Sequence, residues 1–244
     1  MQKSYKNLAK YYDLCFQQKD YQKEVDFILE LVDKYGINKE SILDVGCGTG
    51  THLCLLKNHF DNLYGVDLNK EILEIAKTKV PGAHFLNAGM SDFKIKEKFD
   101  VITSLYSVFN YNKDVDSATK TLQNFHKHLQ EKGVVIIALY NERTTDKKIS
   151  LHVGKDDDTK VAKIDQFRYI PKDKTVKSEH LVLIKDNEEI DFEVEDDDIY
   201  RIFDFDEIES MVKESGFSNS EIYDRFSFDK AANKSKFPVL VLRR

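Results

Sequence analysis

The residues best suited to chemistry in this sequence lie in a glycine-rich stretch, ILDVGCGTGTHL, from Ile42 to Leu53. Gly46, Gly48 and Gly50 alternate there, and glycines behind a strand let the backbone come close to a ligand. A phosphate-binding P-loop would carry a lysine after its last glycine, whereas Thr51 follows here. A dinucleotide-binding loop would place its third glycine one residue later. The stretch therefore does not match a loop built for phosphates.

Two acidic residues indicate which ligand the loop would bind. Asp44 stands two residues before the first glycine, where a carboxylate repels a pyrophosphate and attracts an ammonium group. Asp67 closes the next apolar run, NLYGVDL. A carboxylate at that place can accept hydrogen bonds from both hydroxyl groups of an adenosine ribose. An adenosine that carries an amino-acid cation and no phosphate is S-adenosylmethionine, so this cofactor is predicted.

Alternating strands and helices are expected to position these residues. From about Ser41 to Leu139, five apolar runs alternate with stretches whose apolar residues recur at helical spacing. This alternation predicts βαβ units and a parallel sheet covered by helices on both faces. In such a sheet, ligands bind at the carboxyl ends of the strands. Asn69 is expected to cap the helix KEILEIAKTKV.

The segment over residues 149–200 has a different pattern. VAKIDQFRYI, KTVKSEHLVLI and EEIDFEVEDDDIYRIF alternate polar and apolar residues between short polar turns, which predicts an antiparallel β insertion. A helix, DEIESMVKESGF, and two closing strands follow. We therefore expect an N-terminal helical lid over residues 1–35, a core over 36–148 and 201–244, and an insertion over 149–200 that serves the substrate or a dimer.

Several of these segments together resemble a known family. LDVGCGTG, GVDLNKEILEIAK, FDVITSLYSVFNY and HLQEKGVVIIAL, in this order, are similar to the class I S-adenosylmethionine-dependent methyltransferases. The resemblance implies an α/β fold with a Rossmann-like seven-stranded sheet, mostly parallel, whose last strand is antiparallel. AKYYDLCFQQKDYQKEVDFI, SLYSVFNY and the insertion further resemble the nucleotide-linked amino-sugar N,N-dimethyltransferases. The chain is thus expected to methylate a small molecule, the amine of a nucleotide-linked sugar, and to form a homodimer through the insertion.

The resemblance also implies a set of site residues. Gly89 stands where the family often has an acid that touches the adenine amine, so the backbone of Gly89 and Met90 is expected to cover that edge. Tyr5 and Tyr12 are expected to close over the cofactor and substrate. Some relatives carry a histidine where Tyr111 stands, so a proton acceptor here would be a tyrosine or water. The candidate catalytic residues are Tyr12, Tyr106 and Tyr111. The candidate cofactor-binding residues are Asp44, Gly46, Cys47, Gly48, Gly50, Asp67, Leu68, Gly89, Met90, Leu105 and Tyr12.

Composition argues against several other functions. The 244 residues include 43 acids and 37 Lys and Arg, a net charge of -6, which argues against a nucleic-acid partner. The three cysteines form no C-x-x-C motif, so no metal site is predicted. No apolar run approaches the ~20 residues of a membrane span, and a cytoplasmic protein is expected. The acidic run Asp196 to Asp198 lacks the spacing of a calcium loop and is interpreted as a solvated turn.

Alternative functions remain open on the sequence alone. A methyltransferase for another acceptor, such as a small-molecule oxygen or nitrogen, tRNA or protein, would carry the same cofactor motifs. A regulatory module would bind S-adenosylmethionine without catalysis. Turnover with a panel of acceptors separates these alternatives. A nicotinamide dehydrogenase is disfavoured because the glycine spacing is wrong.

Overall fold

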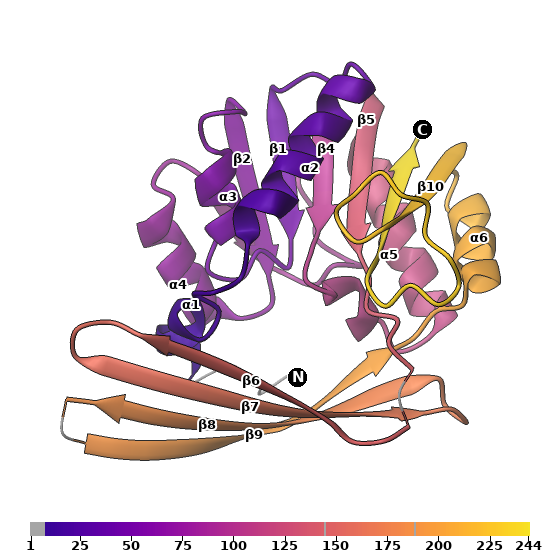
Figure 1. The fold of residues 1–244 in the computed structure, drawn as a ribbon. Coiled ribbons are helices and arrows are strands. Elements are labelled where there is room, and N and C mark those ends of the chain that lie inside the picture. The colour runs from indigo at the N-terminus through magenta and orange to yellow at the C-terminus, as the bar shows by residue number, and fades with distance from the viewer. Residues whose placement is uncertain (1–7, 144, 188) are drawn as a thin grey trace. The chain divides into compact units, whose positions relative to one another are not determined.

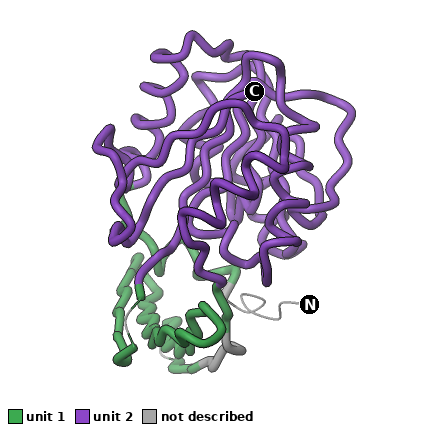
Figure 2. The backbone as a smooth tube through the Cα atoms, turned by 90° about the vertical axis from the view of Figure 1, so that its right-hand side faces the viewer, with its two compact units in different colours: residues 1–20, 143–200 green, residues 21–142, 201–244 purple. Residues whose placement is uncertain are grey.

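The computed structural model describes residues 8–143, 145–187 and 189–244. Contacts within the chain group these residues into two units (Figure 2). Unit 1 contains residues 8–20 and 143–200, and unit 2 contains residues 21–142 and 201–244. Within the segment predicted to be a lid, the first helix packs on the insertion and the second helix packs on the core sheet; its role as a lid stays a prediction.

Unit 2 is built on a seven-stranded sheet in the order β10-β11-β5-β4-β1-β2-β3 (Figure 1). Its strands are β1 (Ser41–Val45), β2 (Asn62–Asp67), β3 (His84–Asn87), β4 (Phe99–Ser104), β5 (Leu129–Ala138), β10 (Asn219–Asp224) and β11 (Pro238–Arg243). The pairs from β5 to β3 are parallel, and β11 is antiparallel to both β5 and β10. The predicted sheet, mostly parallel with an antiparallel last strand, is confirmed.

Helices cover both faces of this sheet (Figure 1). One face is covered by α2 (Tyr21–Lys34), α3 (Thr51–Leu56) and α4 (Lys70–Lys79), and the other by α5 (Val115–His128) and α6 (Phe205–Glu214). Every residue of β4 is buried, as expected for a central parallel strand that is covered on both faces. Asn69 caps α4 as predicted, because its side chain accepts a hydrogen bond from Ile72 N at 3.1 Å. Within the described parts of the chain, none of the helices combines the length and hydrophobicity that a membrane span requires.

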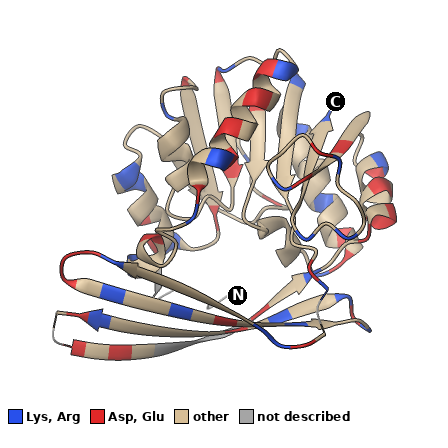
Figure 3. Cartoon of the chain, viewed as in Figure 1, with Lys and Arg blue, Asp and Glu red and all other residues tan. Residues whose placement is uncertain are grey.

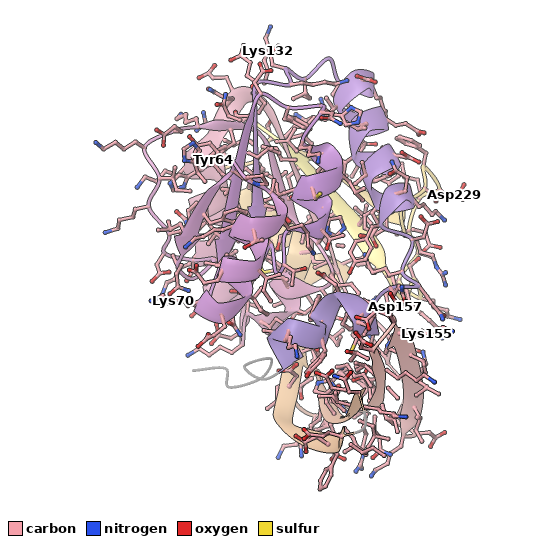
Figure 4. All side chains as sticks on the ribbon, turned by 90° about the vertical axis from the view of Figure 1, so that its left-hand side faces the viewer. Tyr64, Lys70, Lys132, Lys155, Asp157 and Asp229 are labelled. Atoms are coloured by element: carbon pink, nitrogen blue, oxygen red, sulfur yellow. The ribbon has the colours of Figure 1, made fainter. Side chains whose placement is uncertain are left out.

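The two edges of this sheet can be told apart by two lysines in Figure 4. Lys70 begins α4, directly after the carboxyl end of β2, and Lys132 lies near the start of β5. The parallel strands end on the side of Lys70. The glycine loop, Asp67 and the segment after β4 all follow strand ends on this side, as the sequence predicts.

Unit 1 is a four-stranded sheet in the order β6-β7-β8-β9. Its strands are β6 (Lys148–Lys155), β7 (Thr159–Ile170), β8 (Thr175–Asp186) and β9 (Glu189–Arg201), and β7 pairs antiparallel with both β6 and β8. Lys155 and Asp157 lie at the turn from β6 to β7 (Figure 4). The sequence predicts three of these strands and misses β6.

The N-terminal segment of unit 1, which contains η1 (Leu8–Tyr11) and α1 (Tyr12–Cys15), packs on this sheet. Cys15 and Phe16 join the apolar cluster that β7 and β8 form through Val161, Val182 and Ile184. A Cβ atom on Gly154 of β6 would lie 1.7 Å from the carbonyl oxygen of Leu14. Glycine is therefore required where α1 crosses β6.

A buried charged network lies on the same face of the sheet. Lys163 and Asp165 of β7, His180 of β8 and Asp198 of β9 are each at most 3% exposed. His180 Nε2 lies 3.2 Å from Asp198 Oδ2, and Asp165 contacts both Lys163 Nζ and His180 Nδ1. The interpretation of Asp196 to Asp198 as a solvated turn is thus wrong. The run lies inside β9, and the charge of Asp198 is compensated by a histidine from the neighbouring strand.

The network is expected to make stability depend on pH. Burial alone would lower the pKa of His180, but the hydrogen bonds of Asp165 and Asp198 outweigh it, so the pKa is raised above its ordinary value. Stabilisation from a raised pKa is complete below the ordinary value and is lost as the pH rises through the folded-state value. Calorimetry of the full chain should therefore show a melting temperature that falls as the pH rises above the ordinary histidine pKa of about 6.5.

His180→Gln should flatten this dependence and should lower the melting temperature mainly at the acidic end. His59, which is exposed on unit 2, offers a matched control, and His59→Gln should follow the wild type. Identical profiles for the wild type and His180→Gln would refute the assignment.

Candidate cofactor and active site

The glycine loop over residues 46–50 is fastened to the neighbouring strand. Gly46, Gly48 and Gly50 have φ values of +77°, +54° and +77°, a left-handed conformation that favours glycine. The N–H groups of Gly46 and Cys47 both donate to the carbonyl oxygen of Val66, at 2.7 and 3.1 Å. The loop is therefore held at the carboxyl end of β2.

The segment after β4 rests on this loop. A Cβ atom on Gly46 would lie 2.4 Å from Val108 Cγ1, so the first residue of η2 (Val108–Tyr111) packs directly on the backbone of Gly46. Tyr106 and Ser107 have positive φ values of 52° and 64°, which costs about 1–2 kcal/mol for each non-glycine residue. Such strain is concentrated at functional sites. Tyr106 is 43% exposed, and Tyr111 closes the same short helix.

Asn110 fixes η2 to the backbone of two other segments. Its side chain donates to the carbonyl oxygens of Tyr140 and Arg201 at 3.0 and 2.7 Å, and it accepts a hydrogen bond from Tyr140 N at 2.8 Å. The residue is 1% exposed. Asn110 therefore gives the segment that carries Tyr106 and Tyr111 a rigid base.

Asp67 presents a pre-organised carboxylate at the end of β2. Its Oδ2 accepts a hydrogen bond from Gly48 N at 3.0 Å, and its Oδ1 accepts one from Asn69 N at 2.9 Å. Burial raises the pKa of Asp67, and these N–H groups oppose that shift. Each oxygen keeps a second lone pair. The pair of oxygens can therefore accept two further hydrogen bonds from adjacent hydroxyl groups.

An apolar surface lies beside this carboxylate. Leu68 is 61% exposed, and its Cδ2 lies 3.9 Å from the place of a Cβ atom on Gly89. The neighbouring Met90 is half-buried, and its sulfur accepts a hydrogen bond from Asn112 Nδ2 at 3.3 Å. The structure therefore brings Leu68, Gly89 and Met90 together next to Asp67, and their surface fits a flat, mostly apolar ring.

Asp44 places a negative charge beneath the glycine loop. It is 1% exposed, and its Oδ1 accepts a hydrogen bond from Thr103 Oγ1 at 2.8 Å. Burial is the main reason that the pKa of Asp44 is raised. With Asp67, it gives the loop two carboxylates. These groups fit a ligand with ribose hydroxyls and an ammonium group, and they would oppose a pyrophosphate.

Some charged neighbours of the loop were not singled out from the sequence. His52, in α3, pairs with Glu24 of α2, with Nε2 and Oε2 2.6 Å apart. Lys79 of α4 donates to the hydroxyl oxygens of Thr49 and Thr51 at 3.0 and 2.9 Å. The position of His52 directly after the loop was a usable signal. Glu24 and Lys79 lie on helices that are distant in sequence, and no local pattern indicates that they contact the loop.

The remaining predicted residues lie in different surroundings. Cys47 is buried, and burial raises the pKa of its thiol, which disfavours a nucleophilic thiolate. Leu105 is 3% exposed and belongs to the core of unit 2. Tyr12 belongs to unit 1, where its ring centroid lies 4.8 Å from that of Phe16. Tyr5 lies outside the described residues.

Comparison with known proteins gives a consistent result. The family described as "Methyltransferase domain" matches residues 42–133. The dTDP-3-amino-3,4,6-trideoxy-alpha-D-glucopyranose N,N-dimethyltransferase of Streptomyces venezuelae is 32% identical over 160 residues, which cover 64% of this chain and 68% of that enzyme. The dTDP-3-amino-3,6-dideoxy-alpha-D-glucopyranose N,N-dimethyltransferase of Streptomyces fradiae is 32% identical over 132 residues, about half of each chain.

Solved structures extend the likeness to both units. The crystal structure of DesVI from Streptomyces venezuelae has a TM-score of 0.85 and 25% sequence identity. The superposition covers 96% of this chain and 97% of DesVI. It therefore includes the antiparallel insertion as well as the seven-stranded sheet.

Proposed function

This chain belongs to the class I S-adenosylmethionine-dependent methyltransferases, and from that premise we propose that it methylates the amino group of a nucleotide-linked sugar. Its methyl donor is S-adenosylmethionine. The observation that carries the proposal is the likeness to DesVI over 96% of the chain. That likeness includes unit 1 as well as the cofactor-binding sheet. The two Streptomyces enzymes are named as dimethyltransferases of dTDP-linked amino sugars, which supports an amine acceptor.

The cofactor would be held by residues of unit 2. Asp67 would accept hydrogen bonds from the ribose hydroxyls, and Leu68, Gly89 and Met90 would cover the adenine. The backbone of Gly46, Cys47, Gly48 and Gly50 would lie along the methionine end, with the charge of Asp44 attracting its ammonium group. Leu105 would support this loop from the core.

The acceptor would be positioned by the tyrosines beside the loop. The cofactor supplies an activated methyl group and its own leaving group, so the protein must align the amine for in-line attack and exclude water. Tyr106 and Tyr111 lie on the segment that packs on Gly46, and we assign their hydroxyl groups to orienting the amine. A tyrosine or water would then accept the proton. The contact predicted for Tyr12 stays a prediction.

A turnover assay tests this function. The purified chain would be incubated with S-adenosylmethionine and dTDP-linked 3-amino sugars, and products would be followed by mass spectrometry. We expect gain of one or two methyl groups on the amino sugar and none on the matched sugar with a hydroxyl in place of the amine. Cofactor binding without turnover of any acceptor would favour a regulatory module. Turnover of a different acceptor alone would refute the amino-sugar assignment.

Unit 1 supports a homodimer as a further part of the proposal. The face of its sheet opposite the charged network exposes large apolar side chains: Ile149 63%, Leu151 62%, Val153 47%, Leu183 41% and Ile199 59%. Cross-strand neighbours make Leu151, Ile164 and Leu181 one continuous row. An exposed apolar patch of this kind marks an association surface. Sedimentation should give twice the chain mass, and a monomer at micromolar concentration would refute this proposal.

The surface charge bears on the proposal about other partners. Acidic and basic residues are interspersed along α2 and over the strands of unit 1 (Figure 3), and the net charge is -6. A net negative charge disfavours a nucleic-acid partner, and we propose a small-molecule substrate and a cytoplasmic location.

A further inference from the structure

One buried asparagine joins three segments beside the proposed cofactor site. Asn112 directly follows η2 and is 6% exposed. Its Nδ2 donates to the carbonyl oxygen of Phe109 at 2.9 Å and to the sulfur of Met90 at 3.3 Å. Its Oδ1 accepts a hydrogen bond from Thr121 Oγ1 of α5 at 2.8 Å. A side-chain amide has two N–H donors and one oxygen, so each of these groups has a partner, and Asn112 is held in one orientation.

Helix α5 also holds the backbone of Met90. Asn124, which follows Thr121 by three residues, donates from Nδ2 to the carbonyl oxygens of Met90 and Phe93, both at 3.3 Å. Residues three apart on a helix lie on the same face. One face of α5 therefore fixes both the Asn112 side chain and the segment that carries Met90.

Met90 needs this support to form a defined surface. A methionine side chain has three rotatable bonds and adapts its shape to its surroundings, and Met90 is only half-buried. The hydrogen bond from Asn112 to its sulfur restricts the side chain to rotamers in which the sulfur faces that amide. The proposed adenine cover is thus ordered by a residue that is distant from it in sequence.

The segment η2 depends on the same amide. It is a single turn of four residues, and the hydrogen bonds of such a 3₁₀ turn have poorer geometry than those of an α-helix. The carbonyl oxygen of Phe109 accepts hydrogen bonds from both Nδ2 and the backbone N of Asn112, at 2.9 and 3.2 Å. Asn112 therefore closes the turn that carries Tyr111.

We propose that Asn112 is a positioning residue that fixes the adenine cover and the acceptor segment in one frame, so that it sets both the affinity for the cofactor and the order of η2. This inference rests on the proposed function, because it takes Met90 as part of the adenine cover and Tyr111 as part of the acceptor segment. Asn112 itself contacts neither ligand and acts through Met90 and Phe109.

Asn112→Asp removes both donated hydrogen bonds at nearly constant shape. Its affinity for S-adenosylhomocysteine in calorimetry should fall roughly 2-fold to 10-fold, the net worth of one hydrogen bond. The affinity for 5′-methylthioadenosine, which has the same adenosine and lacks the amino acid, should fall by the same factor. Hydrogen exchange followed by mass spectrometry should show that the backbone amides of Val108 and Asn110, which donate within this turn, exchange faster than in the wild type.

Asn62→Asp is the matched control. It makes the same chemical change at an exposed amide, which donates to the carbonyl oxygen of Glu40 at 3.0 Å at the start of β2. Both affinities and the exchange of η2 should equal those of the wild type. Circular dichroism would establish that each variant is folded.

Two substitutions of Met90 separate the hydrogen bond from apolar packing. Met90→Leu keeps an apolar side chain of similar volume and loses the acceptor, whereas Met90→Gln is more polar and offers an oxygen to Asn112. Met90→Leu should therefore lose more affinity for both ligands than Met90→Gln, although a purely apolar cover would give the reverse order. Neither substitution should speed exchange in η2, because Asn112 keeps its hydrogen bond to Phe109.

Three results would overturn the inference: unchanged S-adenosylhomocysteine affinity in Asn112→Asp, unchanged exchange of η2 in that variant, or tighter binding by Met90→Leu than by Met90→Gln. If Asn112→Asp does not fold, Thr121→Val, which removes the hydroxyl that Asn112 accepts, must show smaller changes of the same kind in affinity and exchange.

Failure of the proposed function gives different results. A wild type that binds neither ligand would overturn the cofactor site, and this inference with it. A wild type that binds both ligands but methylates only another acceptor would overturn the amino-sugar assignment alone, since the affinity and exchange measurements contain no acceptor and decide the role of Asn112 by themselves.

Discussion

Gly46→Ala is expected to destabilise unit 2 by about 2–5 kcal/mol and to abolish cofactor binding. The added methyl group would lie 2.4 Å from Val108 Cγ1, and the φ of +77° would be strained as well. Relief of the overlap requires either the loop or η2 to move. Urea unfolding and S-adenosylhomocysteine titration would measure the two effects.

Gly36→Ala is the matched control. Gly36 has a similar φ of +61°, but an added Cβ would meet no atom within 4 Å. The loss of stability caused by Gly36→Ala should be limited to the backbone strain of about 1–2 kcal/mol. Combining Gly46→Ala with Val108→Ala should recover part of the lost stability, because the smaller side chain makes room for the methyl group. Equal costs for the two single glycine substitutions would contradict the packing of η2 on the loop.

Asp67→Ala should weaken S-adenosylhomocysteine binding by about 1–3 kcal/mol, the cost of losing a partly buried charged acceptor. That range corresponds to roughly 5-fold to 150-fold in the dissociation constant. The substitution also removes the hydrogen bonds that Gly48 N and Asn69 N donate to the Asp67 carboxylate, at 3.0 and 2.9 Å. Isothermal titration calorimetry measures the change.

Asp67→Asn separates the two roles of this side chain. It keeps one oxygen as an acceptor and replaces the other with a donor. Its affinity for S-adenosylhomocysteine should therefore lie between those of the wild type and Asp67→Ala. Asp61→Ala, at an exposed acid before the same strand, should leave the affinity unchanged. An Asp67→Ala variant that binds as well as the wild type would show that the ribose is held elsewhere.

Most of unit 2 could be predicted because its signals are local. The first apolar run ends at a glycine and the second at an acid, and the residues after β1, β2, β3 and β4 necessarily follow one edge of a parallel sheet. Asn69 could be predicted as a helix N-cap from its immediate sequence neighbours alone. The glycine loop and Asp67 could be placed at one edge for the same reason, since the spacing of strands and helices determines where each strand ends.

The other features depend on residues that are distant in sequence. Asp198 looked solvent-exposed because an acid is almost never buried without a partner, and its partner His180 lies on the preceding strand. Glu24 and His52 are 28 residues apart, and the packing of Val108 on Gly46 joins two loops. Periodicity along the chain contains no information about such pairs.

The division of the chain also determines the order in which the protein can fold during synthesis. Unit 1 draws on residues up to 20 and then on 143–200, and unit 2 on 21–142 and 201–244. Helix α1 is made before β6 to β9, and it has no surface to pack on until these strands are made. The sheet of unit 2 is completed later still, because its strand β11, the last in sequence, lies between β5 and β10. Domains fold as their residues become available. Unit 1 is therefore the first unit whose residues have all left the ribosome, and the cofactor-binding sheet of unit 2 is completed last.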